Sequence, residues 1–196
     1  MKNNTNGLIL DIYTEDGSRT QFCQHDERIA EQTLRQLVSP RLFNPPLLTL
    51  ASEDSVSALP TRTIDMIFAH TESPPMLPLP SGWVDAVQVN DDSLLHLAHL
   101  NKTSAAENKN IMLVEIHTVG DWLIRLKLET MMLETVQEER QLWNHLLELP
   151  AIPFHLMDGG IGAINPANIV RATVCPPIDG VAETALSADL LQCIRP

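Results

Sequence analysis

Two short segments of the chain carry side chains suited to acid–base chemistry at the same spacing. Asp11 and Tyr13 lie two residues apart in the first segment, and Glu115 and His117 hold the corresponding positions 104 residues further on. Residues two apart on a strand face the same side of a sheet. If the two strands face each other, two carboxylates, a phenol and an imidazole converge, which suits proton transfer or metal binding. These four residues are therefore the catalytic candidates.

A structural role for the same residues is the alternative. Each acid lies on one strand of a predicted hairpin, and the returning strand carries an arginine, Arg19 in the first segment and Arg125 in the second. Opposite charges often pair across the exposed face of a hairpin. We favour this structural explanation over catalysis.

His96 and His99 form a candidate metal-binding pair on a predicted short helix. Helical neighbours three apart can share an ion, since imidazole is a common ligand of zinc, copper and nickel. The corresponding part of the second half carries Gln192 and Arg195 instead, and the sequence has no HExxH or cysteine-rich zinc pattern. We therefore predict no metal and no cofactor.

The other motifs are interpreted as structural. Residues 158–162 form the only glycine-rich run, but the extended segment after it predicts a hairpin turn, whereas a phosphate-binding loop needs a following helix. No GxSxG is present, so the nucleophile elbow of hydrolases is missing. Cys23, Cys175 and Cys193 have no CxxC spacing and an odd number, which predicts reduced thiols.

The acid–base segments belong to a longer similarity between the two halves of the chain. In each half a predicted hairpin is followed by a helix, two extended runs and a final strand, and a Pro-Pro pair closes the series. In the first half Asp26 caps a helix over residues 27–38. In the second half Thr130 caps the helix and Pro150 ends it. A similarity of this kind predicts an internal repeat.

The repeat sets the predicted architecture. We expect an α+β fold made by tandem duplication of a β-β-α-β-β unit, with mostly antiparallel sheets, helices on one face and a pseudo-twofold arrangement. The first unit spans residues 1–102, including a proline-rich connector at 72–82 and a short helix. Residues 103–110 form a linker, and the second unit with a C-terminal helix spans 111–196. A pocket between the two units would be the default ligand site.

Charge and hydropathy limit the partners. Thirteen Lys and Arg against 25 Asp and Glu give a net charge of −12, which repels nucleic acid and anionic membrane surfaces. The N-terminal residues are polar, and no run of about 18 apolar residues occurs, so neither a signal peptide nor a membrane span is expected. These features predict a cytoplasmic protein that binds neither nucleic acid nor membrane.

Two functions fit these observations. The first, which we favour, is a non-enzymatic protein-interaction or ligand-binding module, whose partner is another protein, a second copy in a homodimer or a small ligand. Apolar positions recur between the halves, whereas most polar residues with chemical potential do not. The second is a small enzyme with an acid–base or metal site where the two repeats meet.

Overall fold

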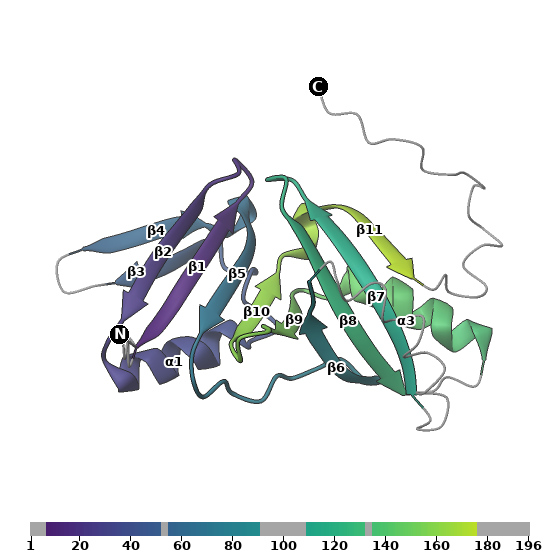
Figure 1. Cartoon of the computed structure of the whole chain (residues 1–196). Coiled ribbons are helices and arrows are strands. Elements are labelled where there is room, and N and C mark those ends of the chain that lie inside the picture. The colour runs from purple at the N-terminus through teal and green to yellow at the C-terminus, as the bar shows by residue number, and fades with distance from the viewer. Residues whose placement is uncertain (1–6, 52–54, 91–108, 132–134, 176–196) are drawn as a thin grey trace.

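Strands are the predominant secondary structure of the computed structural model, which describes residues 7–51, 55–90, 109–131 and 135–175 (Figure 1). Nine strands form one sheet in the order β11-β7-β8-β6-β9-β10-β5-β1-β2, and β3 and β4 form a separate two-stranded sheet. The described residues contain two α-helices. The elements are β1 (Leu8–Thr14), β2 (Arg19–Gln24), α1 (Glu27–Leu37), β3 (Leu47–Ala51), β4 (Val56–Pro60), β5 (Ile64–His70), β6 (Trp83–Gln88), β7 (Lys109–Thr118), β8 (Leu123–Met131), α3 (Val136–Glu148), β9 (Ile152–His155), β10 (Ile161–Ile164) and β11 (Ile169–Cys175).

The first hairpin and α1 form as the local sequence predicts. In β1 the alternating residues Leu8, Leu10 and Ile12 are buried on one face of the sheet. The Asp26 carboxylate caps α1 by accepting a hydrogen bond of 3.0 Å from the backbone amide of Ile29. The helix and the β3–β4 hairpin both pack against the β1 leucines, so this face of the sheet is covered.

The helix of the second half begins later than Thr130. The burial of β8 alternates along its length, and this alternation places Thr130 inside the strand, fully buried. The cap is Thr135, whose hydroxyl accepts from the Glu138 amide while the Glu138 carboxylate accepts from the Thr135 amide. The prediction of a Thr130 cap is therefore wrong, because a period of two continues through this residue.

The predicted α+β tandem repeat of two β-β-α-β-β units is also wrong. Strands of the two halves interleave in a single mixed sheet: β10 pairs with β5 of the first half, and β6 of the first half pairs with β8 and β9. The β3–β4 hairpin forms its own sheet, whereas β9 and β10 lie inside the large one. The part of the chain that the structure describes is mostly β and does not form two separate sheets that each carry a helix on one face.

The interleaving follows from the apolar character of β5. Residues 64–69 of this strand are all buried, so both of its faces need cover. Ile67 packs with the β1 and α1 side chains, while Met66 and Phe68 pack with β7, β8 and Leu146 of α3. Pairing with β1 on one edge and β10 on the other completes the burial of β5. The domain limits at 102 and 111 stay predictions; of the linker, 103–108 lie outside the described residues and 109–110 belong to β7.

A buried carboxylate ties the two halves together. Asp65, which has no exposed surface, accepts hydrogen bonds of 2.7 Å from the Thr118 hydroxyl and the Gly120 amide and one of 3.0 Å from the Asn168 side chain. A side chain at position 120 would overlap the Asp65 carboxylate and the backbone carbonyl of Thr14. Figure 1 shows the result, with the β1–β2 and β7–β8 hairpins leaning together at their turns.

We expect Asp65→Ala to destabilise the protein by about 2 kcal/mol or more, because it leaves the buried Thr118 hydroxyl and Gly120 amide without an acceptor at about 1–3 kcal/mol each, whereas the Asn168 amide keeps the carbonyls of Arg62 and Ile64. Urea denaturation followed by far-ultraviolet circular dichroism measures the change. Glu72→Ala, at an exposed position shortly after β5, is the control and should alter the free energy of unfolding by no more than about 0.5 kcal/mol. Equal midpoints for the two variants would contradict a central role for Asp65.

Candidate functional site

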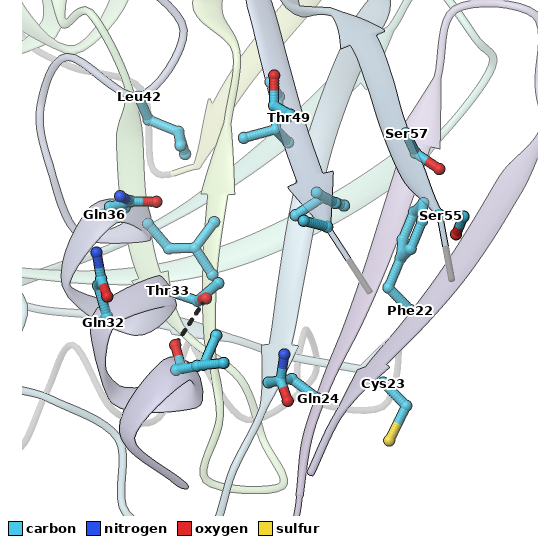
Figure 2. Close-up of a pocket in the computed structure, with 15 residues that line it drawn as sticks. Phe22, Cys23, Gln24, Gln32, Thr33, Gln36, Leu42, Thr49, Ser55 and Ser57 are labelled. Carbon is cyan, nitrogen blue, oxygen red and sulfur yellow. Dashed lines mark hydrogen bonds between the residues drawn. The ribbon is translucent and has the colours of Figure 1, made fainter. Parts of the chain in front are cut away.

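A groove lies between α1, the edge strand β2 and the β3–β4 hairpin (Figure 2). Its volume is about 250 Å³. The apolar side chains that line it are Phe22, Ile29, Leu37, Leu42, Leu48, Leu50 and Ala51, together with the thiol of Cys23. The polar ones are Gln24, Gln32, Thr33, Gln36, Thr49, Ser55 and Ser57. None of the described lining residues carries a charge, although the whole chain has a net charge of −12.

The helix contributes to this groove because it has two different faces. Leu34 and Leu37 are buried against the sheet, whereas Gln32, Thr33 and Gln36 lie along the groove. Gln32 and Gln36 are four residues apart, so their amides lie one turn apart on the same side of the helix. The Thr33 hydroxyl donates to the backbone carbonyl of Ile29 at 2.9 Å, as Figure 2 shows.

The hairpin supplies the opposite wall by alternation. Leu48 and Leu50 pack toward the core beneath the hairpin, and Ser57, which pairs with Leu50, shares their face. Thr49 and its partner Ala58 are exposed on the other face, although Thr49 is also among the residues that line the groove. A single residue step along β4 separates Ser57, which lines the groove, from Ala58, which does not.

Asp11 lies at the centre of a second cluster of polar residues, on the face of β1 opposite Leu10. Its carboxylate accepts hydrogen bonds from Arg19 at 2.7 Å and Gln21 at 3.0 Å, both on β2. His70 Nε2 lies 3.0 Å from the same carboxylate. The ion pair with Arg19 agrees with the structural explanation, but Asp11 is only 1% exposed and is not part of an exposed face.

The environment of Asp11 favours its charged form. Burial raises the pKa of this carboxyl, but the hydrogen bonds from Arg19, Gln21 and His70 and the charge of Arg19 outweigh burial, and the net pKa lies below 3.8. Burial also raises the pKa of Tyr13 above 10, against the effect of Arg19. At neutral pH the carboxyl is therefore an anion and the phenol keeps its proton.

His70 joins this cluster to the second half of the chain. Its Nδ1 lies 2.6 Å from the carboxylate of Asp158, in the turn between β9 and β10, while Nε2 faces Asp11. Burial raises the pKa of Asp158, but the hydrogen bonds from His70 and the Gly160 amide lower it below 3.8 overall. Since both ring nitrogens face carboxylates, His70 bridges β1 and the turn between β9 and β10.

Glu115 and His117 lie in a different cluster. Arg125 Nε donates to Glu115 Oε2 at 2.8 Å, which is the ion pair expected across this hairpin. Arg171 of β11 lies 2.6 Å from His117 Nε2, and His117 Nε2 lies 3.1 Å from Glu115 Oε1. These residues thus pair among β7, β8 and β11, whereas Asp11 pairs among β1, β2 and β5.

The structure therefore places the four catalytic candidates in two groups. Tyr13 packs against Phe68 and Trp122, with ring centroids 4.8 and 4.9 Å away, and Trp122 donates to the Thr14 carbonyl at 3.1 Å. This contact brings the two hairpin turns together. Among the described residues, no hydrogen bond or ion pair joins Asp11 to Glu115 or His117.

The metal candidates His96 and His99 lie outside the described residues. Within the described part of the chain, no group of three or more His, Cys, Asp or Glu side chains is arranged to hold a metal ion. Cys23 and Cys175 are free thiols, and Cys193 lies outside the described residues. No helix among the residues that the structure describes is long and apolar enough to cross a membrane.

The His70 bridge could not be predicted from the sequence, and only one wall of the groove left a signal there. Asp11 and His70 are 59 positions apart, and His70 and Asp158 are 88 apart, so their contact depends on strand order. The spacing of Gln32, Thr33 and Gln36 on a predicted helix was the one available signal for the groove, because these polar residues flank the apolar stripe.

Comparison with known proteins gives no further guide to the site. No protein-family model matches the chain, and neither the curated proteins nor the solved structures provide a significant match.

We expect Asp11→Asn to lower the free energy of unfolding by about 1.5–3 kcal/mol at pH 7, the range for hydrogen bonds to a charged group. A folded-state pKa below the unfolded one means that the charged carboxyl stabilises the fold fully above about pH 4 and loses this effect as the pH falls through the folded pKa. The difference between wild type and variant should therefore shrink below pH 4. Urea midpoints at pH 7, 4 and 2.5 measure it, with Glu72→Gln as the control. A constant difference across this range would contradict the assignment.

Proposed function

We propose that the protein is a non-enzymatic ligand-binding protein whose groove between α1, β2 and the β3–β4 hairpin holds a small, uncharged, amphipathic molecule. The observation that carries the proposal is the lining of the groove, in which the described residues are apolar or polar and uncharged. Pockets for small ligands typically combine mostly apolar walls with a few polar groups that fix orientation.

The size of the groove indicates a small ligand. Its 250 Å³ lies just below the range of about 300–1,000 Å³ that is usual for ligand pockets. A flexible chain of several carbon atoms with one polar end suits these dimensions. The leucines of α1 and of β3 would contact the carbon chain.

The uncharged lining residues of the groove favour an uncharged ligand. An ion that enters the groove loses part of its hydration and finds no opposite charge among the described lining residues, which is unfavourable. A hydroxyl or amide group loses less free energy on leaving water, because it can form new hydrogen bonds in the groove. The side-chain amides of Gln32 and Gln36 and the hydroxyl of Ser57 can donate to such a group and accept from it.

The alternative, an acid–base enzyme built on the four candidates, has less support. Asp11 is paired with Arg19, Gln21 and His70, and Glu115 is paired with Arg125. The groove contains none of these residues. Ligand binding uses the groove without requiring that these pairs be broken.

We expect Ser57→Trp to weaken the binding of 1-octanol at least tenfold, because the indole fills the groove. Ala58→Trp adds the same bulk to the outer face of the same strand and should leave the affinity unchanged. Ligand-observed NMR titration measures both dissociation constants, and the thermal unfolding midpoint of each variant reports on its fold. If both variants bind 1-octanol as the wild type does, the groove is not the site.

We expect octanoate and octylammonium to bind wild-type protein at least about tenfold more weakly than 1-octanol. The three molecules share the same carbon chain, so the difference of 1.4 kcal/mol or more reports the cost of placing a charge in the groove. The same NMR titration at pH 7 provides the comparison. Binding of either ion with the affinity of 1-octanol would disprove the preference for an uncharged ligand.

A further inference from the structure

A second cavity lies where the C-terminal ends of α1 and α3 meet. Its volume is about 160 Å³, and its walls come from both halves of the chain. We call it the proline cavity, because five of its twelve lining residues are prolines, namely Pro40, Pro78, Pro80, Pro150 and Pro153. The proposed ligand groove shares one residue with it, Leu37.

The walls of the proline cavity are rigid. The pyrrolidine ring fixes the backbone angle φ and has no side-chain rotamers to lose, so a ligand that contacts prolines immobilises little of the protein. A site that is already shaped for its ligand binds it more tightly for the same contacts. The prolines come from three separate segments, around residues 40, 78–80 and 150–153, and the fold must hold all of them in place before the cavity exists.

The volume indicates one ring. An engineered apolar cavity of about 150 Å³ in another protein holds benzene, and the proline cavity is of similar size. The C–H groups of a proline ring beside its amide nitrogen carry a partial positive charge, and the face of an aromatic ring is negative. A flat aromatic ring therefore contacts these walls better than a saturated ring of the same size.

The polar groups indicate a hydroxyl on that ring. Apart from Ser39 and His145, the described lining residues are apolar. The Ser39 oxygen accepts from the Arg41 amide at 3.2 Å and keeps its own proton for a further acceptor. His145 lies in the last turn of α3 and lines the cavity, so its imidazole can hydrogen-bond a ligand there.

The two helix ends determine the sign of charge that the cavity accepts. The C-terminal end of a helix carries a partial negative charge, and both α1 and α3 end at this cavity. An anionic ring is repelled, whereas the proton of a hydroxyl group is attracted. We propose that the proline cavity binds a small, uncharged, single-ring aromatic molecule that bears a hydroxyl group, the phenol class.

The test measures phenol binding to the full chain by ligand-observed NMR. Phenol should bind with a dissociation constant of about 1 mM or below, as expected for seven non-hydrogen atoms. Cyclohexanol and benzoate should each bind at least about fivefold more weakly, since one lacks the aromatic face and the other is an anion. Benzoate binding as tight as that of phenol overturns the proposal.

Substitutions assign the binding to this cavity. Ser39→Phe fills it and should abolish phenol binding, whereas Ser81→Phe adds the same ring at an exposed position outside the cavity and should not. His145→Ala leaves the cavity open and should weaken binding about three- to tenfold through the loss of a hydrogen bond. Ser57→Trp fills the groove and leaves the proline cavity open, so it should not change phenol binding. This variant distinguishes binding in the proline cavity from binding in the groove. Loss of phenol binding in Ser57→Trp together with unchanged binding in Ser39→Phe overturns the proposal.

Discussion

The buried carboxylate of Asp65 is the constraint on which the arrangement of the two halves depends. A carboxyl group without exposed surface is tolerated only where hydrogen-bond donors surround it. The donors to Asp65 come from Thr118, Gly120 and Asn168, at sequence separations of 53 to 103 residues. The turn after β7 and the segment before β11 must therefore dock at the start of β5. Glycine at 120 permits this docking, because any side chain there would occupy the same space as the carboxylate.

Both cavities follow from the way in which β5 is buried. Its two edges pair with β1 and β10 and its two faces are covered, so the β3–β4 hairpin packs outside the large sheet. The hairpin and α1 then lie over the same face of the sheet and leave the groove between them. The place of β10 also brings the end of α3 near the end of α1, where the proline cavity forms.

Local features of the structure could be predicted, whereas the pairing of distant strands could not. The Asp26 cap, the start of α1 and the ion pairs of Arg19 and Arg125 with the two acids depend on residues close in sequence, and the structure confirms them. The tandem repeat was wrong because similar segments do not determine their strand partners: residues 152–164 enter the large sheet, while the similar residues 47–60 do not. The polar residues at the groove were visible on the helix, but the opposing hairpin wall was not.

The place of β10 next to β5 has a consequence for synthesis of the chain. When the first half has left the ribosome, one edge of β5 still has no partner, because that partner is residues 161–164. An unpaired, apolar strand edge is a site of wrong pairing between chains. Pairing over such sequence distances also slows folding. The sheet around β5 therefore cannot be completed until residues 161–164 have been synthesised. Until then, the open edge of β5 can pair with other chains.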